Sequence, residues 1–161
     1  MQFSDRFKTE ESKALFEKGG EIIELVSEIA ALIPEDNEIL NEIARFMRED
    51  SYVMQVKIVG AEGGGLYDIK MECAALIRKA GRDLYVQKHS LEMFDFEYVS
   101  YMDLLREKID EYKVLFKEWV STFDPYHAIK DDWGLFNPPG IELPDADDDD
   151  AADFFDDEDD D

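Results

Sequence analysis

The chain has 161 residues, of which 41 are acidic and 17 are basic, so its formal net charge is −24 at pH 7. An acidic chain repels phosphate backbones and anionic lipids, and no apolar stretch approaches the ~20 residues of a bilayer span, which argues against a direct nucleic-acid or membrane partner. The single cysteine, Cys73, excludes an intrachain disulfide, and with the polar N-terminus it leads us to expect a cytoplasmic protein.

The first predicted helix covers residues 9–33, with Thr9 as its N-cap. Its apolar residues recur at helical spacing: Leu15, Ile22, Val26, Ile29 and Ile33. Gly19 and Gly20 interrupt this pattern, and two adjacent glycines cost about 2 kcal/mol in a helix interior relative to alanine. We therefore expect either a break in the helix or an element packed very close to its backbone.

Two further helices are expected in the middle of the chain. Pro34 ends the first pattern, and a second helix follows up to about Val59. Residues 60–65 read Gly-Ala-Glu-Gly-Gly-Gly and predict a loop. A third helix is expected from Leu66 to about Lys88, and no run of residues reads convincingly as a strand.

The fourth predicted helix begins near Ser90 and carries the clearest pattern in the chain. Its apolar residues alternate at spacings of four and three: Tyr98, Met102, Leu105, Ile109, Tyr112, Phe116, Trp119 and Phe123. Four amphipathic helices with short connections predict an all-α, antiparallel up-down four-helix bundle over residues 1–123. Val99, Leu115 and Val120 widen the last apolar stripe, which would also allow a homodimer.

Beyond the bundle, residues 124–144 are irregular yet apolar. They include Tyr126, Ile129, Trp133, Leu135, Phe136 and Ile141. Exposing these side chains would cost about 25 cal/mol per Å² of apolar surface, so we expect the segment to fold back along the bundle. From Ile141 onward the chain has 13 acidic residues and no basic one, and residues 145–161 are predicted to form a disordered acidic tail.

No catalytic or metal-binding constellation is recognisable. Helical bundles that bind iron or manganese usually carry Glu-x-x-His motifs, and this chain has none. His89 falls near a predicted helix end, without the neighbours of a phosphotransfer histidine. Cys73 lies on an apolar face, where a cysteine is usually a small buried hydrophobe. We therefore expect a non-enzymatic protein with no cofactor and no metal.

Asp50 is the one residue that breaks the apolar pattern. It falls on the seam of the second predicted helix, where an unpaired carboxylate is expensive. Counting from the neighbouring turns places it, within about a turn, roughly opposite Gly19 and near residues 73–75. One interpretation is a buried polar site with Glu72 and Tyr101 that binds a small molecule or a metal. The alternative, which we favour, is a rim position paired with Lys or Arg of a neighbouring helix.

The acidic tail also contains an aromatic pair, Phe154 and Phe155. In composition it resembles the acidic tips of single-stranded-DNA-binding proteins, although it ends in aspartates. Tails that mix carboxylates with aromatic rings can dock in basic, apolar-floored grooves. We predict an interaction or adaptor protein that uses Trp133, Phe136 and the aromatic pair, and whose tail engages a basic surface of a partner protein. The rival is a small-molecule or metal-binding bundle centred on Asp50.

Overall fold

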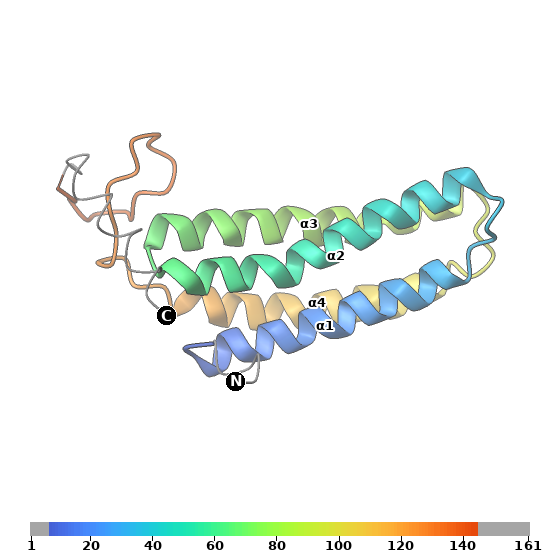
Figure 1. The fold of residues 1–161 in the computed structure, drawn as a ribbon, viewed down its shortest axis with the longest axis horizontal. Coiled ribbons are helices and arrows are strands. Elements are labelled where there is room, and N and C mark those ends of the chain that lie inside the picture. The colour runs from blue at the N-terminus through green and yellow to red at the C-terminus, as the bar shows by residue number, and fades with distance from the viewer. Residues whose placement is uncertain (1–6, 145–161) are drawn as a thin grey trace, which may run out of the picture.

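The computed structural model describes residues 7–144, which contain four antiparallel helices and no strand (Figure 1). The helices are α1 (Glu10–Ala31), α2 (Glu38–Gly64), α3 (Tyr67–Met93) and α4 (Tyr101–Ser121). α1 packs on α2 and α4, α2 packs on α3, and α3 and α4 pack least closely of these four neighbouring pairs. The predicted all-α four-helix bundle is therefore confirmed.

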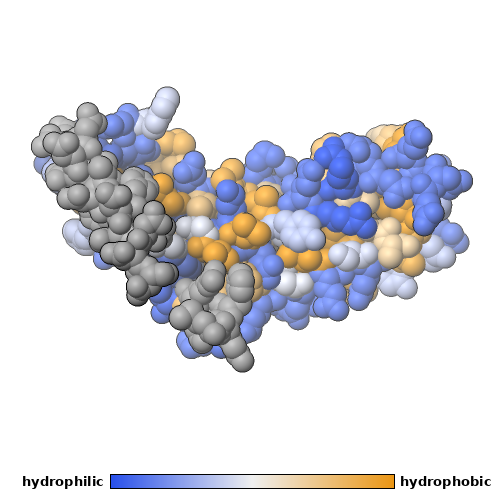
Figure 2. Space-filling view, viewed as in Figure 1, coloured by the Kyte–Doolittle hydropathy of each residue, from blue (hydrophilic) through white to orange (hydrophobic). Residues whose placement is uncertain are grey.

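The helices bury their apolar stripes against one another. Side chains from all four helices are fully buried: Leu15, Ile22, Met47, Ile58, Ile77, Leu84, Leu105 and Trp119. The surface of the bundle seen in Figure 2 is mainly hydrophilic, with apolar side chains emerging along its middle. Within residues 7–144, no helix combines the length and the apolarity that crossing a membrane requires.

α1 begins at the predicted cap. The Thr9 hydroxyl accepts a hydrogen bond from the backbone N–H of Ser12 at 3.1 Å. The Ser12 hydroxyl in turn accepts from the backbone N–H of Thr9 at 3.4 Å. This reciprocal capping box satisfies two backbone donors at the start of the helix.

α1 is continuous through its glycine pair, because another helix packs against it there. A Cβ atom at Gly19 would lie 3.3 Å from the carbonyl oxygen of Met54 and 3.3 Å from the Cβ of Gln55. On α3, a Cβ at Gly81 would lie 3.3 Å from the Met54 Cε. From α4, the Tyr112 hydroxyl donates to the Met54 carbonyl at 2.6 Å. All three other helices thus close around Met54 of α2.

The predicted loop at residues 60–65 is wrong, because α2 continues through Gly64. Ala61 and Glu62 are buried there, so tertiary packing outweighs the helix cost of the surrounding glycines. The helix ends at Gly65, whose φ of 70° is a left-handed conformation that glycine adopts without strain.

The predicted start of the fourth helix is also wrong. α3 continues past Ser90, because Leu91 is fully buried and extends the apolar seam of that helix. The chain then reverses through Asp95, which has a φ of 58°, and the Phe96 N–H donates to the Leu91 carbonyl at 2.9 Å. α4 begins only at Tyr101.

Candidate functional site

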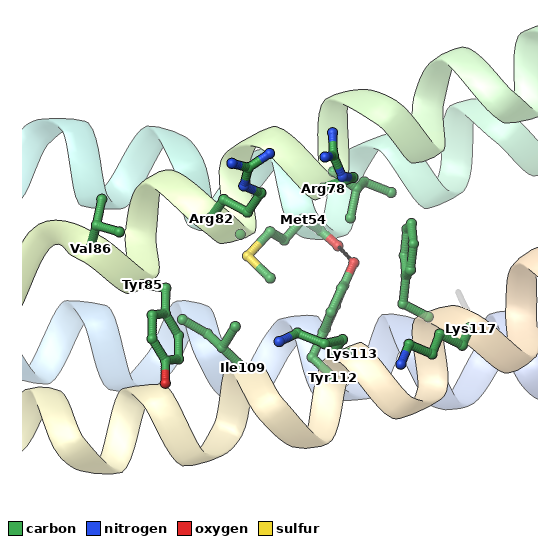
Figure 3. Close-up of a pocket in the computed structure, with 12 residues that line it drawn as sticks. Met54, Arg78, Arg82, Tyr85, Val86, Ile109, Tyr112, Lys113 and Lys117 are labelled. Carbon is green, nitrogen blue, oxygen red and sulfur yellow. Dashed lines mark hydrogen bonds between the residues drawn. The ribbon is translucent and has the colours of Figure 1, made fainter.

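A groove of about 530 Å³ lies between α3 and α4 (Figure 3). Its lining residues are Met54, Ile77, Arg78, Gly81, Arg82, Tyr85, Val86, Ile109, Tyr112, Lys113, Phe116 and Lys117. Met54 of α2 lies between the two flanking helices in this view. The volume falls in the range of about 300–1,000 Å³ that is usual for ligand pockets.

The borders of the groove are positively charged. Arg78 and Arg82 come from α3, Lys113 and Lys117 come from α4, and no acidic side chain lines the groove. The spacing of four residues places both members of each pair on one side of their helix. Lys113 Nζ lies 3.8 Å from Asp110, whereas the other three cations form no ion pair within residues 7–144. The groove is thus a locally cationic surface on an acidic chain.

The interior of the groove is apolar and well fixed. Tyr112 is buried, and its hydrogen bond to the Met54 carbonyl satisfies its only donor. Burial raises the pKa of Tyr112, so the phenol stays neutral at physiological pH. Arg106 lies 4.6 Å from the centroid of the Tyr85 ring and donates from Nε to the Tyr85 carbonyl at 2.9 Å, which holds this ring in place.

A buried carboxylate joins the end of α2 to α4. Glu62 is only 4% exposed, and its Oε1 accepts a hydrogen bond from the indole N–H of Trp119 at 3.1 Å. Lys70 Nζ lies 3.9 Å from the same oxygen and 5.3 Å from the centroid of the Phe123 ring. The other oxygen, Oε2, is buried without a hydrogen-bond partner among the described residues. This cluster was not predicted from the sequence, because residues 60–65 have the composition of a loop and Glu62 lies among them.

Asp50 is half-buried on α2, beside α3. Burial, followed by the nearby charge of Asp83, raises its pKa to about 6, and the ammonium of Lys79 opposes this rise. Lys79 itself pairs with Asp83, with 2.6 Å between Nζ and Oδ2. A carboxylate in this position is costly to charge, because its nearest cation already has a partner.

The other residues of the predicted polar site lie on the surface. Glu72 is exposed on α3, about two turns or 10 Å before Lys79, and Tyr101 is exposed at the first residue of α4. Gly19 faces Met54, so Asp50 lies about one turn from the position opposite Gly19, which is within the tolerance of the prediction. Within the part of the chain that the structure describes, no three His, Cys, Asp or Glu side chains gather to hold a metal ion.

The predicted register between the second and third helices is wrong. α2 is longer than expected, so its pairing with α3 shifts along the bundle. The Cβ position of Gly60 lies 3.9 Å from the Cys73 sulfur. Asp50 therefore lies near Lys79 and Asp83 and not near residues 73–75.

Residues 131–137 form a closed turn, which we call the Asp131 turn. The Asp131 carboxylate accepts hydrogen bonds from the backbone N–H groups of Trp133 at 3.0 Å, Leu135 at 2.9 Å and Phe136 at 2.9 Å. The Asn137 side chain accepts from the Asp131 N–H at 2.8 Å and donates to the Asp131 carbonyl at 3.2 Å. The N–H groups of Phe136, Leu135 and Trp133 lower the pKa of Asp131, because they stabilise its charged form.

The Asp131 turn projects its largest side chains into solvent. Trp133 is 94% exposed, Leu135 is 73% exposed, and Phe136 is half-buried. The expectation that these apolar residues fold back along the bundle is therefore wrong for Trp133 and Leu135, and also for Tyr126, which is 77% exposed. The physical reason is that the turn satisfies its backbone groups internally and directs both side chains outward.

The chain before the Asp131 turn is tied to the bundle. The Tyr67 N–H, at the start of α3, donates to the His127 carbonyl at 2.8 Å. The His127 ring packs against Gly65, where an added Cβ would lie 3.2 Å from the ring. The segment thus leaves α4 at the end of the bundle where α3 begins (Figure 1). The predicted contact residues Phe154 and Phe155 lie outside the described residues.

No protein-family model matches this chain, and the searches of curated proteins and of solved structures found no protein similar to it.

Proposed function

We propose that this protein is a non-enzymatic interaction or adaptor protein that docks on a partner protein through the Asp131 turn. The observation that carries the proposal is the presentation of Trp133, which is 94% exposed on a turn closed by its own hydrogen bonds. Tryptophan is enriched among the residues that dominate binding energy in protein interfaces. A backbone held in advance by such a turn loses little conformational entropy when the indole binds.

The acidic tail is the second element of the proposal. Residues 145–161 contain 12 acidic residues and no basic one. Such a tail would steer the encounter with a basic surface over about a Debye length, roughly 8 Å at physiological salt. Trp133 would then supply the short-range anchor, so the preferred partner has a basic surface beside an apolar pocket.

The test compares full-length baits that differ in one exposed aromatic residue. Trp133→Ala removes the proposed anchor, and Tyr126→Ala is the matched control, because Tyr126 is also exposed in the same segment. Proteins retained by the wild type and by the control, but lost with Trp133→Ala, are then titrated as purified partners. We expect Trp133→Ala to weaken binding by about 2 kcal/mol, which is roughly 30-fold.

A second variant tests the turn itself. Asp131→Ala keeps the indole but removes the acceptor of three backbone hydrogen bonds, so we expect it to weaken partner binding as well. Both variants should leave the thermal unfolding of the bundle unchanged, because the turn lies outside the core. Identical partner sets for all baits, or no partner for any of them, would contradict the proposal.

A further inference from the structure

We propose that the groove between α3 and α4 is a docking site for the protein's own acidic tail, residues 145–161, with Phe154 and Phe155 against its apolar interior. The proposal rests on charge, on apolar surface and on reach. Its consequence for partner binding depends on the function proposed above, whereas the docking itself does not.

Charge complementarity is the first argument. The groove is bordered by four cations and by no acid, and Arg78, Arg82 and Lys117 have no ion-pair partner among residues 7–144. The tail contributes 12 acidic residues and no cation of its own. Opposite charges joined by one chain meet at a high effective concentration, of about millimolar order for a short flexible connection. A weak contact is therefore enough to occupy the groove.

The apolar interior is the second argument. Phe154 and Phe155 have Asp153 before them and acidic residues 156–161 after them. The groove combines the same two kinds of side chain, because Ile77, Ile109 and Phe116 line it together with the four cations. Aromatic rings placed there would leave water and would also face guanidinium groups, which attract the faces of aromatic rings.

Reach is the third argument. The described chain leaves α4 at the end of the bundle where α3 begins (Figure 1). Arg78 lies about 17 Å along α3 from Tyr67, and Lys117 lies about one turn before the end of α4. Phe154 follows Pro144 by ten residues, and an extended segment of that length spans up to about 33 Å. That length is about twice the distance along α3 from Tyr67 to Arg78, at the near end of the groove.

Docking of the tail would regulate its availability. A tail held in the groove cannot at the same time engage a basic partner surface, so the two sites compete for the same carboxylates and rings. A partner must then bind the tail more tightly than the groove does. Proteins with weakly basic surfaces would therefore not bind the tail.

The experiment places a nitroxide label on the tail of the full-length protein. Cys73→Ser removes the only native thiol, and Ala152→Cys provides the labelling position beside the aromatic pair. We expect paramagnetic loss of amide intensity at Gly81, Val86 and Lys113. We expect no loss at Asn37, because this N-cap of α2 lies at the end of the bundle opposite to the start of α3. Salt should restore the lost intensity, because it screens the attraction.

Variants of the groove and of the tail test the contact, and a control removes the same two charges elsewhere. Arg82→Gln with Lys117→Gln should abolish the intensity loss, and Phe154→Ser with Phe155→Ser should reduce it from the side of the tail. Arg48→Gln with Lys8→Gln is the matched control, because both residues are exposed and lie outside the groove. The control should keep the loss unchanged.

Three results would overturn the proposal. They are no loss at the groove amides, an equal effect of the groove and control variants, and a loss that grows with protein concentration, which would assign the bound tail to a second copy. The amide spectrum of each unlabelled variant shows whether the bundle is intact. Since the sample contains no partner, its outcome is separate from that of the Trp133 test.

Discussion

Asp50 shows how one side chain can make the stability of a bundle depend on pH. Its pKa of about 6 exceeds the value of about 3.9 expected for an unfolded chain, because burial and the charge of Asp83 disfavour the carboxylate. The unfolded state therefore releases this proton more readily than the folded state does. The folded protein carries the full penalty above pH 6, and this penalty decreases as the pH falls through 4 and disappears near pH 3.

We predict that Asp50→Asn stabilises the protein at pH 7.5 by about 1 kcal/mol, after allowance for the solvent screening of a half-exposed group. The gain should vanish near pH 3, where Asp50 is mostly protonated in both states. Urea unfolding at the two pH values measures it. Asp132→Asn, at an exposed position outside the helices, is the control and should change neither value. A gain that is equal at both pH values would refute this assignment.

At the residue scale, the sequence pattern indicates which side chains face inward, but it does not indicate which residues they contact. The seam of the second helix indicated Asp50 as an inward position, and in the structure this residue is half-buried. Its neighbours, Lys79 and Asp83, could not be predicted, because they depend on where α2 ends. The contact of Glu62 with Trp119 was missed for the same reason, although Glu62 follows Ile58 at helical spacing.

The space available for a side chain at a glycine differs between helices α1 and α2. At Gly19 a methyl group would meet the Met54 carbonyl at 3.3 Å, and that backbone atom has little freedom to move. At Gly60, on α2, the nearest atom is the Cys73 sulfur at 3.9 Å, which is an ordinary contact. The same substitution should therefore have opposite effects at the two positions.

We predict that Gly60→Ala raises the free energy of unfolding by about 1 kcal/mol, because alanine is the better helix former. Gly19→Ala gains the same propensity but forces α1 away from α2, so we expect a net loss of about 1 kcal/mol. Denaturant titrations of both variants measure these values. A stabilised Gly19→Ala variant would contradict the close packing at Met54.

At the scale of helices, apolar periodicity predicted their number and order, and local composition failed at their ends. Residues 60–65 have the composition of a loop, yet the burial of Ala61 and Glu62 keeps them helical as far as Gly64. Ser90 has the chemistry of an N-cap, yet the buried Leu91 carries α3 past it. In both places, burial against another helix determines where the helix ends, and the neighbouring residues in the sequence do not reveal that burial.

The whole molecule carries a large excess of one charge. Its formal net charge of −24 implies self-repulsion in the folded state, and most of its ion pairs are on the surface, where each contributes little. Raising the ionic strength from about 0.01 M to 0.15 M shortens the Debye length from about 30 Å to about 8 Å. Salt therefore screens the repulsion more than it weakens any favourable pair.

We predict that the melting temperature rises with sodium chloride over this range. A variant in which Asp156, Asp157, Asp159, Asp160 and Asp161 are replaced by Asn should show a smaller rise, because it starts with less repulsion. Differential scanning calorimetry at several salt concentrations measures both slopes. If the melting temperature fell with salt, surface ion pairs would have to outweigh the net charge.

The groove is a property of the assembled molecule, and the sequence offered only a partial signal for it. Arg78 with Arg82, and Lys113 with Lys117, each form a pair at helical spacing. Their common location depends on the loose packing of α3 on α4 around Gly81, which no local pattern encodes. The Asp131 turn escaped prediction as well, because its apolar residues suggested burial.

The two tryptophans occupy opposite environments, since Trp119 is fully buried and Trp133 is 94% exposed. The emission of the native protein is accordingly the sum of a blue-shifted component from a dry interior and a red-shifted component from an indole in water. A soluble quencher such as acrylamide should extinguish the second and spare the first. Binding at the Asp131 turn should therefore change the emission of Trp133, and loosening of the helices should change the emission of Trp119. No added dye is needed to follow either process.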